Sequence, residues 1–437
     1  MNKKTNLGII FFPAFDWKIS PNHPEREERL LYTQDQIFEE GLADLDEIEF
    51  YNPTIASIED IKRVHFIYPS VKDVLTSSHF IAAGAAIKSL NLVMENKVNK
   101  AFSLTRPPGH HAQTVVYGDR GFCIVNNVAV MVEKIRQKYG NLKVAIIDTD
   151  AHHADGTQDI YWNDKNTLLI SLHQDGRTLY PGSGFINELG SPNAFGYNIN
   201  IPLPPNTTDE GYHYIIDNLV LPILKDFNPD IIINSAGQDN HYSDPLTNMN
   251  LSAQGYASLN EKLNPDVAVL EGGYSIEGAL PYINLGIIFA MSGIDYTNVI
   301  EPDFKKNKIK QSKEITTYIE KLSNNILNIW KNKDIILKET FPKQDIYTFK
   351  HNVYYDTSNI QEQQTRKYYS CSKCQSISTI ESKNNLGKHI FAITIPIDCC
   401  KSCLLKGKNL YNKTNVNLYS CVFLQNKKED LYLKKTP

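Results

Sequence analysis

The segment Asp148-Thr149-Asp150-Ala151-His152 carries carboxylates and an imidazole within five residues. If the backbone stays extended here, Asp150 and His152 point to one side and can share a cation. A carboxylate oxygen and an imidazole nitrogen suit Zn²⁺, with Fe²⁺ as the second choice. Asp239 could complete a three-ligand site that leaves one position for water. A hydrogen-bonded turn is the alternative interpretation of the segment.

Two further clusters could do chemistry beside such an ion. The adjacent histidines His110 and His111 follow a rigid Pro-Pro-Gly turn. Two imidazoles with different partners can act as general base and general acid near neutral pH. Hydrogen-bonded loop histidines are the alternative. Later in the chain, Gly272 and Gly273 let the backbone approach a site closely, and Tyr274 offers a hydroxyl to a developing oxyanion.

These clusters come directly after short apolar runs, which predict the elements that position them. The runs are residues 144–148, 168–172, 231–235 and 267–270. Continuous apolar runs are typical of strands buried on both faces of a parallel sheet. Helical patterns alternate with them over residues 80–95, 128–138, 211–224 and 307–337. The alternation predicts an α/β fold with ligands at the carboxyl ends of the strands.

Length and charge predict two domains. Single cores stop growing near ~250–300 residues, and this chain has 437. Residues 341–437 contain 15 Lys and Arg against 7 Asp and Glu, a net charge of +8; residues 1–340 contain the remaining 30 and 42, a net charge of −12. We predict a catalytic domain over 1–340 and a basic accessory domain over 341–437. Two interpretations of the basic domain stay open: a solvated lysine-rich surface, or a surface that docks a protein or nucleic acid.

Apolar segments long enough to enter a membrane are missing from the sequence. None reaches the ~18 residues needed to cross a bilayer. The run over residues 7–12 is too short for a signal peptide and is predicted to be the first strand. This pattern predicts a cytoplasmic protein without membrane contact, and it leaves a nuclear or exported site of action open.

Six of the seven cysteines lie after residue 370. Cys371 and Cys374 form one CxxC pair, and Cys400 and Cys403 form a second after 25 intervening residues. This spacing predicts a zinc-ribbon-like module with a structural Zn²⁺, because clustered thiols in a reducing cytosol favour metal over disulfides. Cys399 could substitute for Cys400. Free thiols in a small core are the alternative.

In this order, the polar clusters resemble the zinc-dependent histone deacetylase family, which includes acetoin-utilisation and acetylpolyamine deacetylase proteins. The resemblance covers about residues 10–292. It is carried by His23-Pro24-Glu25, Arg106-Pro107-Pro108-Gly109-His110-His111, Gly121-Phe122-Cys123, Tyr180-Pro181-Gly182-Ser183-Gly184 and Asp244-Pro245-Leu246, together with the clusters described above. It implies an arginase/deacetylase-like three-layer α/β fold with a central, mostly parallel sheet.

The resemblance also implies a role for each matching residue. The catalytic Zn²⁺ ligands would be Asp150, His152 and Asp239. The catalytic group would be His110, His111 and Tyr274, with Asp148 orienting His110 and Asp155 orienting His111. The walls of an acyl-lysine tunnel would be Phe122, Tyr180, Leu246 and Gly273. An inner K⁺ site would be formed by Asp148, Asp150, His152, Ser171 and Leu172. Arg29 would lie near the internal cavity through which acetate leaves.

The function implied is zinc-dependent hydrolysis of the acetyl amide of acetyl-lysine in a protein or peptide, with histones among the fitting substrates. An acetylpolyamine or other small-molecule amidohydrolase is the alternative. Polyamine-specific relatives place an acidic residue where this chain has the apolar Leu246, which favours acyl-lysine. A catalytically weak reader of acylated lysine is disfavoured, because the implied catalytic set is complete.

Overall fold

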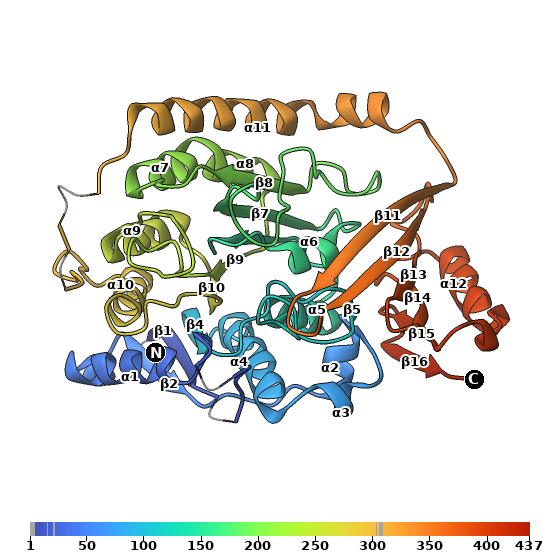
Figure 1. Ribbon diagram of the computed structural model, residues 1–437, viewed down its shortest axis with the longest axis horizontal. Helices are drawn as coiled ribbons and strands as arrows, with labels where there is room; N and C mark the ends of the chain where they lie inside the picture. The colour runs from blue at the N-terminus through green and yellow to red at the C-terminus, as the bar shows by residue number, and fades with distance from the viewer. Residues whose placement is uncertain (1–4, 15, 21, 303, 306–308) are drawn as a thin grey trace.

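The computed structural model describes residues 5–14, 16–20, 22–302, 304–305 and 309–437. Its largest feature is an eight-stranded sheet in the order β2-β1-β4-β10-β9-β6-β7-β8 (Figure 1). Every neighbouring pair in this central sheet is parallel. The predicted α/β class with a central parallel sheet is therefore confirmed.

The strands of the central sheet are β1 (Thr5–Phe12), β2 (Ile48–Tyr51), β4 (Val98–Thr105), β6 (Val144–Asp148), β7 (Thr167–Gln174), β8 (Asn198–Leu203), β9 (Ile231–Ala236) and β10 (Val267–Leu270). A small parallel pair is formed by β3 (Phe66–Ile67) and β5 (Val115–Val116). The helices of this part are α1 (Glu28–Glu39), α2 (Ile58–Lys62), α3 (Val71–Val74), α4 (Ser77–Met94), α5 (Asn127–Tyr139), α6 (Asp155–Tyr161), α7 (Asp209–Ile215), α8 (Leu221–Phe227), α9 (Ala253–Leu263), α10 (Leu280–Ser292) and α11 (Lys313–Thr340).

Two of the predicted helices differ in detail from the observed ones. The helix predicted over residues 211–224 is interrupted by a π-helical turn, Ile216–Val220, between α7 and α8. The helix predicted from Asn307 begins at Lys313; residues 307 and 308 lie outside the described residues. In the described part of the chain, no helix combines the length and the apolar character needed to cross a membrane.

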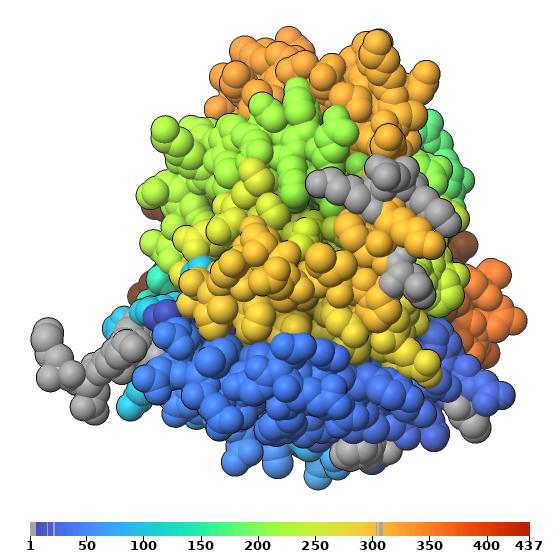
Figure 2. Space-filling model, turned by 90° about the vertical axis from the view of Figure 1, so that its left-hand side faces the viewer, coloured from blue at the N-terminus to red at the C-terminus, as the bar shows by residue number. Residues whose placement is uncertain are grey.

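Two hydrophobic cores lie on opposite faces of the central sheet, because successive residues of a strand point to opposite sides. Ile147 belongs to one core, which also contains residues of α1 and of α7 to α11. Its neighbour Ile146 belongs to the other core, which contains residues of α2 to α5. Figure 2 shows the first of these helical layers from outside, as successive bands of N-terminal, α9–α10, α7–α8 and α11 residues. This arrangement gives the three layers expected from the sequence.

The chain after α11 forms a second sheet in the order β11-β12-β13-β14-β15-β16. Its elements are β11 (Ile346–Tyr355), β12 (Ile360–Tyr369), β13 (Ser378–Asn384), β14 (His389–Ile395), α12 (Lys401–Lys413), β15 (Cys421–Asn426) and β16 (Leu431–Lys435). All neighbours are antiparallel except β14 and β15. We call residues 341–437 the accessory module. The domain boundary at residue 340 stays a prediction; α11 ends at Thr340 and β11 begins at Ile346.

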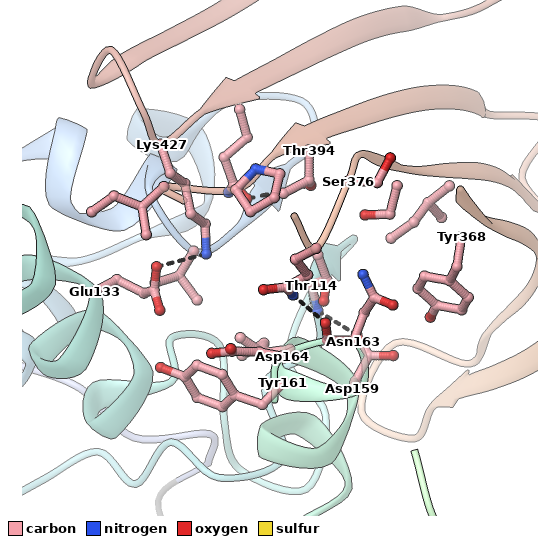
Figure 3. A pocket seen from close by; sticks show the side chains of 18 of the residues that line it. Thr114, Glu133, Asp159, Tyr161, Asn163, Asp164, Tyr368, Ser376, Thr394 and Lys427 are labelled. Atoms are coloured by element: carbon pink, nitrogen blue, oxygen red, sulfur yellow. Dashed lines mark hydrogen bonds and ion pairs between the residues drawn. The ribbon is translucent and has the colours of Figure 1, made fainter. Parts of the chain in front are cut away.

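Charged pairs dock the accessory module onto the body. The Arg366 guanidinium contacts the Asp159 carboxylate with both side chains buried, and Lys427 Nζ lies 2.7 Å from Glu133 Oε2. These pairs line a polar pocket between β12, β15 and the helices of the body (Figure 3). Phe66 and Phe423 add an aromatic contact, with ring centroids 5.5 Å apart. The module is therefore held by specific contacts along its inner face.

We predict that Arg366→Met weakens this docking. Removing one partner of a buried ion pair leaves the other charge uncompensated, which typically costs about 3–5 kcal/mol. Unfolding in urea and limited proteolysis between α11 and β11 measure the effect. Lys367→Met, a change at the exposed neighbouring position of β12, is the control. Equal stability of the two variants would contradict the docking role of Arg366.

Candidate active site

The three predicted metal ligands come together at the carboxyl ends of β6 and β9. His152 Nδ1 lies 2.8 Å from Asp239 Oδ2 and 3.1 Å from Asp150 Oδ1. Both carboxylates are fully buried, and one ligand atom from each of the three residues lies within 4.8 Å of the others. The imidazole and the two carboxylates together could hold one metal ion.

The backbone around the three ligands fits such an ion. The N–H groups of Gly272 and Ala151 donate to Asp150 Oδ2 and Asp239 Oδ1, each at 2.8 Å, so the carboxylates are held in fixed orientations. A Cβ at Gly272 would lie 2.5 Å from Asp239 Oδ2 and 2.6 Å from Asp150 Oδ2. Glycine at this position therefore leaves room for both ligands.

His110 and His111 lie beside this group on the loop after β4, each held by a different carboxylate. His110 Nδ1 lies 3.2 Å from Asp148 Oδ2, and His111 Nδ1 lies 2.6 Å from Asp155 Oδ1. The ring centroids of the two histidines are 4.1 Å apart. Asp148 and Asp155 therefore each contact the histidine with which the resemblance pairs them.

The surroundings move the pKa values of these histidines in opposite directions. Burial lowers the pKa of His110, but the carboxylates of Asp150 and Asp148 outweigh burial and raise it well above its ordinary value. Burial lowers the pKa of His111 well below its ordinary value, and nearby His110 adds to the shift. The carboxylates thus make His110 more basic than His111, so the two imidazoles differ in their affinity for a proton.

Tyr274 lies on the loop after β10, and its backbone N–H donates to Asp244 Oδ2 at 2.7 Å. Burial raises the pKa of its phenol well above the ordinary value, although Arg29 opposes the shift. The Arg29 guanidinium lies 4.9 Å from the centroid of the Tyr274 ring. The hydroxyl therefore stays protonated at neutral pH and can donate a hydrogen bond.

The predicted tunnel residues surround this group. The Tyr180 ring centroid lies 5.3 Å from that of His111, and the Phe122 centroid lies 5.6 Å from that of Tyr274. Gly273, whose carbonyl accepts from Arg29 Nε at 2.8 Å, precedes Tyr274. Leu246 is half-buried; its N–H donates to Asp244 Oδ1, and this carboxylate binds the Tyr274 backbone.

The residues of the predicted K⁺ site are adjacent in the sheet. The register of β6 and β7 pairs Asp148 with Ser171, and buried Leu172 follows on β7. The Asp150 N–H donates to Asp148 Oδ1 at 3.1 Å. Binding of K⁺ at this place stays a prediction.

Sequence reasoning assigned no role to two buried glutamates. Glu271 Oε2 accepts the N–H groups of Gly109 and His110 at 2.7 and 3.1 Å, so it holds the histidine loop against β10. Burial raises the pKa of Glu271 to about 7. Glu25 contacts both Arg29 and Arg106. Glu271 follows an apolar run directly, a signal that could have singled it out.

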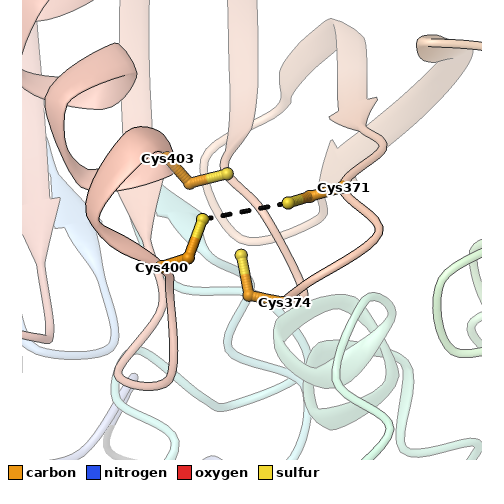
Figure 4. Close-up of side chains that lie close together, drawn as sticks. All are labelled: Cys371, Cys374, Cys400 and Cys403. Atoms are coloured by element: carbon orange, nitrogen blue, oxygen red, sulfur yellow. Dashed lines mark hydrogen bonds between the residues drawn. The ribbon is translucent and has the colours of Figure 1, made fainter.

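The four cysteines of the two CxxC pairs point toward one another (Figure 4). Cys371 and Cys374 lie between β12 and β13, and Cys400 and Cys403 lie at the start of α12. The Sγ atoms of Cys371 and Cys400 are 3.9 Å apart. The Ser402 hydroxyl lowers the pKa of Cys400 to about 6, which favours a thiolate ligand. This cluster agrees with the predicted zinc-ribbon-like module.

A buried carboxylate–imidazole–carboxylate group beside two oriented histidines is typical of metal-dependent hydrolases. Comparison with known proteins agrees with this class. Residues 67–283 match the histone deacetylase domain family. A probable deacetylase of Archaeoglobus fulgidus is 44% identical over 324 residues, which cover 68% of this chain and 89% of the relative. The acetoin utilization protein AcuC of Staphylococcus xylosus is 32% identical, over 57% of this chain and 70% of its own.

A solved structure shares the fold. The crystal structure of the HDA15 HD domain superposes with a TM-score of 0.64 at 26% identity, covering 78% of this chain and 99% of that domain. The chain belongs to the histone deacetylase family, as the resemblance in the sequence implied. The relatives support deacetylase activity on an acetylated substrate.

We predict that Gly272→Ala removes one metal ion from the protein. The new Cβ would displace Asp150 and Asp239, whereas the cysteine cluster is untouched. Elemental analysis should find two zinc ions per chain in the wild type and one in Gly272→Ala. Gly278→Ala is the matched control, since the nearest non-neighbouring atom among the described residues, Ser275 Oγ, would lie 3.8 Å from its Cβ. Full zinc content in Gly272→Ala would contradict the assignment of this site.

Proposed function

We propose that this protein is a zinc-dependent deacetylase that hydrolyses the acetyl amide of acetyl-lysine in proteins, with histones among the fitting substrates. One observation carries the proposal: Asp150, His152 and Asp239 form a buried ligand group beside two histidines that different carboxylates hold. Amide hydrolysis needs an activated water, a polarised carbonyl and a proton for the leaving amine, and this arrangement contains a group for each need.

Zn²⁺ held by Asp150, His152 and Asp239 would act as a Lewis acid and lower the pKa of bound water to about 7. His111 is the neutral base. Asp155 occupies its Nδ1, so Nε2 is the atom that accepts the proton of water and later donates it to the leaving amine. His110, charged and paired with Asp148, stabilises the negative charge that develops nearby. Tyr274 donates its hydroxyl to the acyl oxygen.

The apolar, half-buried Leu246 supports acyl-lysine in proteins as the substrate class, because it offers no charge to a second ammonium group. We predict higher kcat/KM on an acetyl-lysine peptide than on N-acetylputrescine. Parallel assays on both compounds at equal enzyme concentration test this choice. A clear preference for N-acetylputrescine would favour the alternative, an acetylpolyamine amidohydrolase.

The role of Tyr274 has its own test. Removing one oxyanion donor typically lowers kcat by ~10²–10³, so Tyr274→Phe should lose at least about 100-fold. Its zinc content should match that of the wild type, since the phenol is not one of the proposed ligands. Tyr139→Phe, which removes an exposed hydroxyl at the end of α5, is the control. Near-full activity in Tyr274→Phe would exclude the role.

A further inference from the structure

The accessory module reaches the active site through the β11–β12 hairpin. Its strands pair along their whole length, from Ile346 opposite Tyr369 to Tyr355 opposite Ile360. Ten extended residues span roughly 30 Å at about 3.4 Å per residue. The hairpin runs from the accessory module toward β5 and α6 in the middle of the molecule (Figure 1). We call residues 356–359 the hairpin tip.

The end of β11 and the hairpin tip pack against β5 and the loop that precedes Phe122. The Tyr355 hydroxyl donates to the Val115 carbonyl at 2.7 Å. The Thr357 hydroxyl donates to Asp119 Oδ1 at 3.2 Å. The backbone at Gly118 is so close to the tip that a Cβ there would lie 3.2 Å from Ser358 Oγ. The tip is therefore held in one place relative to the tunnel.

The first residue of the tip, Asp356, binds the predicted tunnel residue Tyr180 and the backbone just before Phe122. Its Oδ1 accepts the N–H of Gly121 at 3.0 Å and the hydroxyl of Tyr180 at 3.2 Å. Gly121 precedes the tunnel residue Phe122, and the Tyr180 ring contacts His111. Asp356 is half-buried, whereas the rest of the tip is exposed. The partly exposed carboxylate thus lies beside the aromatic side chains that are predicted to form the tunnel.

Among the described residues no cation forms an ion pair with Asp356, although its negative charge helps to raise the pKa of nearby Arg120. Arg120 Nη1 is engaged by Asp155 Oδ2 at 2.5 Å, and burial lowers the pKa of His23, so that imidazole is mostly neutral at pH 7. Within the described parts of the chain, Asp356 forms no ion pair; its hydrogen bonds go to Gly121 and Tyr180, both through Oδ1. Oδ2 is consequently available to a ligand at the entrance.

We propose that Asp356 is a specificity-determining residue that recognises a second positive charge on the substrate. This inference rests on the proposed deacetylase function. A substrate whose acylated amine enters between Phe122 and Tyr180 keeps the rest of its structure at the entrance, beside Asp356. An ammonium or guanidinium group there completes the carboxylate's missing ion pair. The accessory module thereby supplies a charged residue to the site on the catalytic body.

Two kinds of substrate could present that charge: a peptide with Lys or Arg next to acetyl-lysine, or an acylated polyamine. Two matched pairs separate them. The peptide pair carries lysine or norleucine beside acetyl-lysine, and the small-molecule pair is N-acetylputrescine and N-butylacetamide. Steady-state kinetics on the intact chain compare wild type with Asp356→Asn. The Asn oxygen can still accept from Gly121 and Tyr180, so the substitution removes the charge and keeps the anchor.

We expect Asp356→Asn to raise KM for the cationic member of a pair by about three- to tenfold, the range of a partly exposed ion pair. KM for the neutral member and kcat for both should stay within about twofold. The pair that responds identifies the source of the charge. Asp345→Asn, an exposed change of equal charge at the base of the hairpin, should keep the wild-type preference.

If Asp356→Asn raises KM equally for both members of a pair, Asp356 only positions Tyr180. If KM is unchanged for both members, Asp356 has no role in recognition. Either result overturns the inference. If the wild type hydrolyses none of the compounds, the proposed function fails, and calorimetric titration of the same pairs decides the inference separately. The inference is supported if the wild type binds the cationic member more tightly and Asp356→Asn loses this preference. Equal wild-type affinity for both members overturns it.

Discussion

The burial of negative charge at the carboxyl ends of β6 and β9 is the constraint on which the rest of the site depends. Asp148, Asp150 and Asp239 are fully buried within one small region. An isolated buried carboxylate is very costly, so each must be offset by donors, a partner or a metal ion. The N–H groups of Asp150, Ala151 and Gly272 point at these oxygens. The loops therefore take the conformation that brings these backbone N–H groups to the buried carboxylates.

The need to offset buried charge also explains the residues that lie behind the two histidines. Glu271 binds the backbone of the histidine loop, and its own carbonyl accepts from Arg29 Nη2 at 2.7 Å. Arg29 in turn shares Glu25 with Arg106, and all three side chains are fully buried. Buried charges of alternating sign therefore connect the end of the sheet to the N-terminal segment. Arg29 acts here by binding the loop that presents Tyr274, which is a structural contribution independent of acetate release.

The body could be predicted from sequence because local patterns and fold agree there. Continuous apolar runs marked β6, β9 and β10, and polar residues directly after them marked one edge of the sheet. Parallel pairing then brings Asp150 and Asp239, 89 residues apart in the chain, to neighbouring strand ends. The accessory sheet gave no such signal. Along β12 the buried positions alternate regularly but include Glu362, Gln364 and Arg366, so burial did not appear as apolar alternation.

Two basic residues of the accessory module account for part of the charge asymmetry. The module's Arg366 and Lys427 face inward to Asp159 and Glu133 of the acidic body, so part of the positive charge of the tail is used within the chain. The buried face of the hairpin combines these charged contacts with an apolar cluster of Val353, Tyr355 and Ile360, and its tip ends in polar residues. The position of Asp356 could not be predicted from the sequence. It depends on how β11 and β12 extend across the charged interface with the body, and no local sequence pattern shows this.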